Sequence, residues 1–265
     1  YEPVSAMIGS HIGPTLLLMG ASLALSLLIA VPAGIYSAVK QYSKGDYAVV
    51  TASFIGSSIP SFFLALILIY IFTVKLGILP SGGMNTLGMD GSVADTIRHM
   101  VLPVTVLAVS LAGSNIRYIR SSFLEILQQD YLRTARAKGI GYKRVIWKHA
   151  MRNALLPIVT VIGMQIPMLF GGAVIIEQVF SWPGLGLMTM TAIMGRDYRL
   201  NTIIYSYTTQ AVFALKEILS KPDTLKLKEN RGGVIATLVL TAGVALILAV
   251  APGAFFSIEA SCASS

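Results

Sequence analysis

Residues 13–39 read GPTLLLMGASLALSLLIAVPAGIYSAV, an unbroken run without Asp, Glu, Lys or Arg. A helix that crosses a lipid bilayer needs about 20 mostly apolar residues, so this run is long enough to span one. Similar uncharged stretches follow, although two of them, Met100–Ile116 and Leu200–Leu215, are short. The full set is Gly13–Val39, Tyr47–Val74, Met100–Ile116, Asn153–Ile176, Leu200–Leu215 and Gly232–Ile258. The pattern predicts an all-α, polytopic membrane protein.

The composition supports a lipid environment. Of the 265 residues, 55% are hydrophobic and only 12% are charged, and the mean hydropathy is +0.73. Soluble domains carry about 25% charged residues. A soluble protein with buried core helices is disfavoured, because core helices rarely remain uncharged over such lengths.

Basic residues alternate along the chain in a way that predicts its orientation. The net charge is +8, and the Lys and Arg residues gather in segments 40–46 and 117–152, whereas segment 75–98 has a basic residue only at each edge. By the positive-inside rule, 40–46 and 117–152 are cytoplasmic, and 75–98 and 177–199 are external. Because the positive charge lies between membrane spans, the sequence does not favour nucleic acid as a partner.

The internal spans lack an ionised residue at their centres, and six prolines lie within or at the ends of spans. Carriers coupled to protons or ions normally place charges at such depth, so the energy for any transport is expected to come from outside the membrane domain. A proline within a span predicts a kinked helix. The prolines are Pro14, Pro32, Pro60, Pro103, Pro157 and Pro167.

The basic segment from Glu125 to Arg152 predicts two short helices. Asp130 can cap a first helix over Tyr131–Lys138, and Gly139 suits a left-handed residue at its end. In the second helix, 3.6-residue periodicity places one set of side chains on a single face. That set is Tyr142, Val145, Ile146 and His149. Such a pair could lie on the membrane surface or dock into a groove of a partner.

Five motifs resemble one family of transporters. DYLRTARAKG at 130–139 with HAMRNALLP at 149–157, and GGAVIIEQVFSWPGLG at 171–186, are similar to the cytoplasmic loop and the external segment of binding-protein-dependent ABC permeases. Within these, they resemble the dipeptide, oligopeptide and nickel branch. The matches PTL at 14–16, SIPSFF at 58–63 and HMVLP at 99–103 agree in order and spacing.

The resemblance implies the helical bundle of a type I ABC importer permease in the bacterial cytoplasmic membrane, surrounded by lipid. It further implies a second homologous permease subunit, two ATP-binding subunits and an external solute-binding protein as partners, with no metal or other cofactor. Part of Tyr131–Lys148 would be a coupling helix seated on an ATP-binding subunit. Its residues would be Arg133, Thr134, Ala135, Arg136, Ala137, Lys138 and Gly139.

The second segment would form an external gate. Its candidate residues are Glu177, Phe180, Trp182, Pro183, Gly184 and Gly186. For Glu177 we expect a carboxylate at a loop edge that faces water, or else a contact for a peptide amine. Phe180 and Trp182 suit an interface that is wet on one side, and an aromatic belt followed by a turn is the alternative.

The resemblance is incomplete at both ends. The family normally has a further helix before the region that begins at Pro3, and we expect this helix to be missing. Residues 1–215 are expected to form the permease domain, and residues 216–265 an atypical extension with one more apolar span.

No catalytic motif occurs in the sequence: it lacks a GxxxxGK[ST] phosphate loop and an HExxH pair, and the three histidines are far apart. We therefore predict a permease subunit, not an enzyme, with ATP hydrolysis on separate subunits. It would import dipeptides, oligopeptides, nickel or a similar small solute. The alternatives are a membrane scaffold subunit that does not transport and a secondary carrier.

Overall fold

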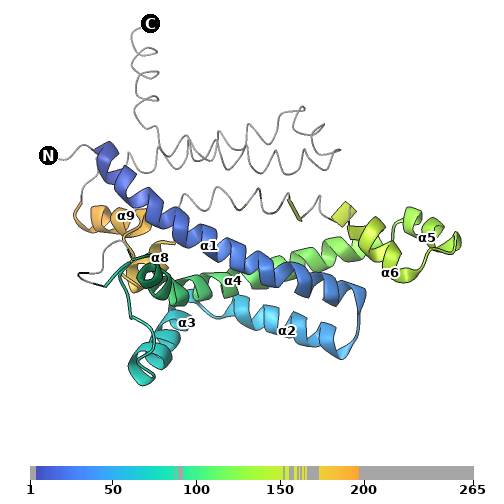
Figure 1. The fold of residues 1–265 in the computed structure, drawn as a ribbon, viewed down its shortest axis with the longest axis horizontal. Helices are drawn as coiled ribbons and strands as arrows, with labels where there is room; N and C mark the ends of the chain where they lie inside the picture. Colours follow the sequence, from blue (N-terminus) through green and yellow to red (C-terminus); the bar gives the residue numbers. More distant parts are fainter. Residues whose placement is uncertain are drawn as a thin grey trace, which may run out of the picture. The chain divides into compact units, whose positions relative to one another are not determined.

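The computed structural model describes residues 4–86, 88, 92–151, 153–154, 158–159, 161, 163, 165 and 173–196. Within these ranges it consists of helices and connecting loops, with no strand (Figure 1). The elements are α1 (Val4–Val39), α2 (Lys44–Ser58), α3 (Ser61–Leu68), the π-helical η1 (Ile69–Lys75), α4 (Val93–Leu127), α5 (Asp130–Ala137), α6 (Tyr142–Arg144), the π-helical η2 (Val145–Ala150), α8 (Val174–Val179) and α9 (Leu185–Met194).

Two helices are long and apolar enough to cross a membrane, α1 over Ala6–Val39 and α4 over Val93–Leu127. They confirm the predicted spans at Gly13–Val39 and Met100–Ile116, and both are longer than predicted. Both remain helical through their prolines at positions 14, 32 and 103. Arg117 and Arg120, which we predicted to lie in a cytoplasmic loop, lie within α4, so they are helical and not part of a loop.

The predicted single span Tyr47–Val74 was wrong as one helix. The chain breaks at Ile59 and Pro60, and the helices on either side are bent by 95°. Ile59 is extended, with φ −73° and ψ 123°, which is the conformation that a following proline imposes. The two halves form either a broken span or a re-entrant loop.

The chain divides into two compact units, one of residues 18–162 and one of residues 1–17 with 163–265. In the first unit, α2 packs along α4 (Figure 1). The approach is close: a Cβ built on Gly113 would lie 2.5 Å from the backbone oxygen of Ser53. Small residues thus bring these helices together, as is common in membrane bundles.

One buried core joins the ends of several helices in this unit. It combines α1 residues with residues of α4, α5 and η2. Its fully or nearly fully buried members include Ala30, Phe123, Leu132, Val145 and Ala150. The segments 40–46 and 117–152, both predicted to be cytoplasmic, are in contact in this unit through Asp46 and Arg120.

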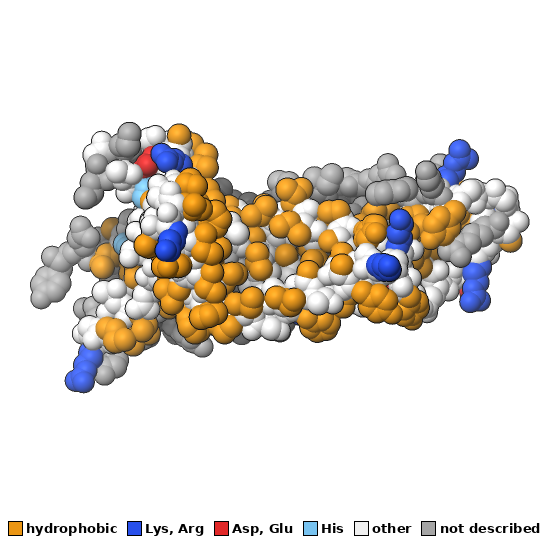
Figure 2. All heavy atoms as spheres, turned by 90° about the horizontal axis from the view of Figure 1, so that it is seen from below, with side chains coloured by type: hydrophobic (Ala, Val, Ile, Leu, Met, Phe, Trp, Pro, Cys, Tyr) orange, Lys and Arg blue, Asp and Glu red, His pale blue; other side chains and the backbone are white. Residues whose placement is uncertain are grey.

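Large apolar side chains also stand on the outside of this unit. Phe54, Phe62, Leu66 and Tyr70 are among the exposed ones. Figure 2 shows hydrophobic side chains over most of the displayed face. A soluble protein rarely exposes so much contiguous apolar surface, whereas lipid-facing helices do.

In the unit of residues 1–17 and 163–265, the start of α1 packs against α9. The apolar contact consists of Ile8 with Leu185, Met188 and Ala192. The predicted spans Leu200–Leu215 and Gly232–Ile258, most of Asn153–Ile176 and the predicted boundary at 215 and 216 lie outside the described residues.

Candidate functional site

The predicted coupling helix exists as α5. It begins at Asp130, so Asp130 is the first helical residue and not the residue before the helix, as we had predicted. The Asp130 carboxylate lies 3.7 Å from Nη1 of Arg133, and both side chains are largely exposed. An ion pair this exposed contributes about 0–1 kcal/mol, so it orients the side chains more than it stabilises the helix.

α5 has one buried face and one exposed face. Leu132 and Ala135 are buried in the core with Phe123 of α4 and with Val145 and Ile146. The exposed residues of α5 are Asp130, Tyr131, Arg133, Thr134 and Ala137, and Lys138 just after the helix is exposed too. Arg136 lies within the helix, although its side chain is outside the described set. Ala135 therefore packs against its own chain and does not face outward with the others.

Gly139 ends this helix in the predicted left-handed conformation, with φ +75°. A Cβ built on it would meet nothing within 4 Å, so glycine is favoured here by backbone conformation and not by space. The chain then continues into α6 and the π-helical η2. Of the four residues predicted to share a face, Val145 and Ile146 are buried in the core, His149 is half-buried and Tyr142 is exposed, so they differ in burial. A π-helical turn follows wider spacing than the 3.6 residues used for the prediction.

A buried ion pair next to this core was missed from the sequence. Arg120 of α4 donates from Nε to Oδ1 and from Nη2 to Oδ2 of Asp46 in α2, both at 2.9 Å. The hydroxyl of Ser37 and the backbone N–H of Tyr42 also donate to this carboxylate. The pair links α1, α2 and α4 at the end that carries α5. No pattern in the sequence indicates this pair, because 74 positions separate the partners.

The predicted gate segment folds into α8, a turn and α9. Phe180 and Trp182 are almost fully buried, so neither a wet interface nor an aromatic belt describes them in this structure. The indole N–H of Trp182 donates to the backbone oxygen of Pro14 at 2.9 Å. Pro183 and Gly184 form the turn that precedes α9, and Gly186 lies in its first turn.

Glu177 is fully buried, which overturns our expectation of a carboxylate facing water. Its Oε1 accepts a hydrogen bond from Thr15 Oγ1 at 3.1 Å, and its Oε2 accepts one from the backbone N–H of Leu187 at 3.0 Å. Thr15 Oγ1 in turn accepts a bond from the N–H of Leu185 at 2.7 Å. In this structure the carboxylate is thus enclosed by its own chain. Thr15 belongs to the PTL motif, but nothing in the sequence connected it with residue 177.

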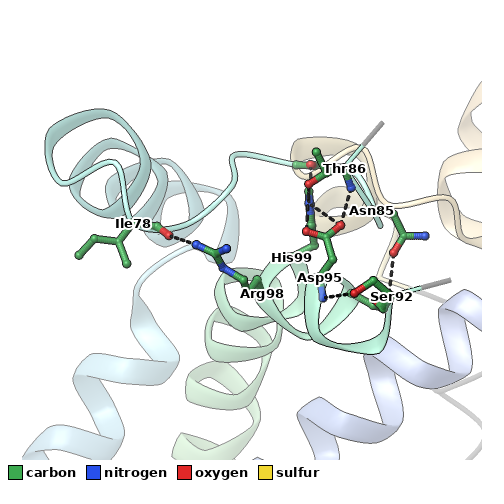
Figure 3. Close-up of polar contacts among 9 residues, drawn as sticks. Ile78, Asn85, Thr86, Ser92, Asp95, Arg98 and His99 are labelled. Atoms are coloured by element: carbon green, nitrogen blue, oxygen red, sulfur yellow. Dashed lines mark hydrogen bonds and ion pairs between the residues drawn. The ribbon is translucent and has the colours of Figure 1, made fainter. Parts of the chain in front are cut away.

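The loop before α4, in the segment predicted to be external, is tied to that helix by side chains (Figure 3). Asp95 accepts bonds from the N–H of Thr86 at 2.6 Å and from its hydroxyl at 2.9 Å. His99 Nε2 lies 3.7 Å from Asp95 Oδ2, and Nδ1 lies 3.0 Å from the backbone oxygen of Gly82. His99 of the HMVLP motif thus holds the loop in place.

The described residues contain no group of three or more His, Cys, Asp or Glu side chains that could hold a metal ion. Asp95 and His99 form only a pair, and both are engaged with the loop.

Comparison with known proteins identifies the family to which this chain belongs. Residues 30–257 match the family described as the binding-protein-dependent transport system inner membrane component. The chain belongs to this family. The family is one of inner-membrane transport components, and the resemblance predicted from the motifs is confirmed.

Several relatives carry names from peptide transport. The oligopeptide transport system permease protein AppB of Bacillus subtilis is 47% identical over 196 residues, which are 74% of this chain and 62% of the relative. A putative peptide permease protein of Brucella ovis is 50% identical over 197 residues, with the same shares. The glutathione transport system permease protein GsiC of Escherichia coli K12 is 39% identical over 74% of this chain and 61% of its own length. The chain thus spans about three fifths of these relatives.

Solved structures confirm the predicted fold. An inward-facing methionine ABC transporter superposes with a TM-score of 0.63 at 18% identity, over 82% of this chain and 94% of that one. An amino acid ABC transporter gives 0.56 at 17% identity, over 81% and 92%. The all-α fold of this family member is therefore that of a type I ABC importer permease.

Proposed function

We propose that this chain is the transmembrane permease subunit of an ATP-driven importer for dipeptides, oligopeptides or a similar small solute. Its relatives are named as permeases for oligopeptides, peptides and glutathione. The observation that carries the proposal is the division of α5 into two faces: Leu132 and Ala135 fix it to its own chain, while Arg133, Thr134 and Ala137 remain exposed.

An ATP-binding subunit would seat on the exposed face of α5. Thr134 and Ala137 have short side chains that permit close approach, and Arg133 supplies a positive charge for acidic groups on that subunit. Gly139 lets the chain turn back directly after the helix. Because protein interiors are close-packed, a displacement of α5 would pass through Leu132 and Phe123 into α4.

The rest of the importer would lie outside this chain. We expect a second homologous permease, two ATP-binding subunits and an external solute-binding protein, with α8, α9 and their turn as the external gate. Residues 1–215 would form the permease domain and 216–265 an extension. The solute itself stays open among dipeptides, oligopeptides, nickel and similar small solutes.

Uptake by vesicles tests this proposal. The complete set of subunits is reconstituted, and uptake of labelled dipeptide and oligopeptide pools, and of nickel, is measured with ATP, without ATP, and without the ATP-binding subunits. Uptake that needs both ATP and those subunits is expected. Uptake that persists without them would indicate a secondary carrier, and absence of uptake for every solute would indicate a scaffold.

Crosslinking tests the docking face separately. Cysteines placed at Thr134 and Ala137 should crosslink to an ATP-binding subunit, whereas a cysteine at Ala135, which is buried, should not. Equal crosslinking at all three positions, or none at any, would contradict the assignment.

A further inference from the structure

The buried carboxylate of Glu177 accepts a hydrogen bond from a backbone N–H in the first turn of α9. The first N–H groups of a helix have no partner within it, and the residue before the helix usually supplies one from its side chain. Here that residue is Gly184, which has no side chain. The N–H groups of Leu185 and Leu187 are instead bound by Thr15 Oγ1 and by Glu177 Oε2. Two residues from other helices therefore cap α9.

The two glycines of this turn make room for the carboxylate. A Cβ built on Gly184 would lie 2.4 Å from Oε2 of Glu177 and 2.5 Å from Oγ1 of Thr15. A Cβ on Gly186 would lie 2.8 Å from the same Oε2. Real Cβ atoms do not approach oxygen atoms so closely. Gly184 and Gly186 therefore serve the approach of the carboxylate to the helix end, in addition to breaking the chain direction.

Because Thr15 and Glu177 are buried, loss of their hydrogen bonds should destabilise this segment. A charged or polar group removed from water must be hydrogen-bonded, and the positive end of a helix dipole favours a carboxylate beside it. Thr15 is the central member, because its hydroxyl accepts from Leu185 and donates to Glu177. Both Thr15 and Glu177 are fully buried. Removal of this hydroxyl would take away the bond from Leu185 and the bond to Glu177, and only the direct bond from the Leu187 N–H to Glu177 would remain.

We infer that Thr15 and Glu177 are positioning residues that fasten the α8–α9 segment to the start of α1, so that the segment and this first part of the helix move as one piece during transport. The inference rests on the proposed function and deepens it, because it assigns Glu177 to the mechanics of the gate and not to the solute. It also adds Thr15, a residue of a different helix, to the gate. The indole of Trp182, bonded to Pro14, provides a second attachment next to it.

Thr15→Val is the sharpest perturbation. Valine keeps the branched shape of threonine but removes the hydroxyl, while the matched control Thr15→Ser keeps the hydroxyl. In the assembled complex, hydrogen exchange of the Leu185 amide should be several-fold faster in Thr15→Val, because its hydrogen bond to the Thr15 hydroxyl is lost. The Leu187 amide, which is bound to Glu177, should change less. Thr15→Ser should exchange like the wild type, and so should the amides of α4 in both variants.

The transport role has its own readout, the number of solute molecules imported per ATP hydrolysed. A variant that only reduces the amount of folded complex lowers both rates and leaves this ratio unchanged. Thr15→Val should lower the ratio several-fold, by roughly the factor expected for one lost hydrogen bond, and Thr15→Ser should restore it. Glu177→Gln combined with Thr15→Val should be no worse than the more severe single change, because both act on one network.

Three results would overturn the inference: exchange at Leu185 that is unaltered in Thr15→Val, a Thr15→Ser variant as defective as Thr15→Val, or an unchanged import ratio. Failure of the proposed function looks different. If the wild-type complex shows no ATP-dependent uptake, the gate assignment fails, whereas faster exchange in Thr15→Val would still establish the attachment of the segment to α1.

Discussion

Removal of the guanidinium from the Asp46–Arg120 pair should destabilise the end of the bundle that carries α5. In Arg120→Met the apolar stem is kept and the charge is lost. The Asp46 carboxylate, whose side chain is 3% exposed, would then keep only the bonds from Ser37 and from the N–H of Tyr42. A buried charge without its partner is far less stable than the pair.

The size of the effect follows from the burial of the two partners. Breaking a fully buried ion pair costs about 3–5 kcal/mol. The Arg120 side chain is 24% exposed, so water can reach the site and reduce the cost, and we expect about 2–3 kcal/mol. For a chain of this size, that corresponds to a melting midpoint lower by about 5–10 °C.

A double-mutant cycle separates the interaction energy of the Asp46–Arg120 pair from other effects of each substitution on stability. Melting midpoints of the purified complex would be measured for the wild type, Asp46→Asn, Arg120→Met and the double variant. The double variant should be more stable than the sum of the two losses by about 1–3 kcal/mol, because neither charge is left alone. Arg120→Lys is the matched control: it keeps the charge but loses the two-pronged geometry, so its loss should be intermediate. Strict additivity, to within about 0.5 kcal/mol, would refute the reasoning.

Three further predictions concern single positions. Gly113→Ala should weaken the packing of α2 on α4, because its Cβ would meet the backbone oxygen of Ser53, and a lowered melting midpoint with faster hydrogen exchange in α2 would verify it. Gly139→Val should lower stability by about 1–2 kcal/mol, because a branched residue is strained at φ +75°, whereas Gly139→Asn should stay close to the wild type. Ala137→Arg should reduce ATP-dependent uptake without a change in melting midpoint, because Ala137 is exposed on the proposed docking face; normal uptake in that variant would count against docking there.

Composition predicted the membrane spans well where the signal was continuous. α1 and α4 were anticipated because a long uncharged run is difficult to place anywhere except in lipid. Tyr47–Val74 met the same criterion, yet it forms two helices at 95°. Hydropathy does not report the direction of the chain, because a run of apolar residues has the same average hydropathy whether the chain continues straight or turns at Pro60. The proline was visible, but prolines 14, 32 and 103 lie within uninterrupted helices, so proline alone does not identify the break.

The site was predicted less completely, for a related reason. The left-handed Gly139 and the helix before it follow from local residue preferences, and both were confirmed. The burial of Ala135 depends on the packing of η2 against α5, and this tertiary contact cannot be read from local residue preferences. Motif resemblance marked residues 130–139 as one block, but it could not divide them into an anchored face and an exposed face.

Glu177 shows most clearly what a motif leaves undetermined. Next to an aromatic and glycine-rich turn, an acidic residue suggests a surface carboxylate, since buried carboxylates are rare. The structure buries it because two glycines let it reach the start of α9 and because Thr15 supplies the remaining donor. The spacing from Glu177 to Gly184 and Gly186 therefore encodes a packing requirement. Other acidic residues followed at this spacing by two glycines and a short helix deserve the same test, with a buried hydroxyl on a neighbouring helix as the partner to look for.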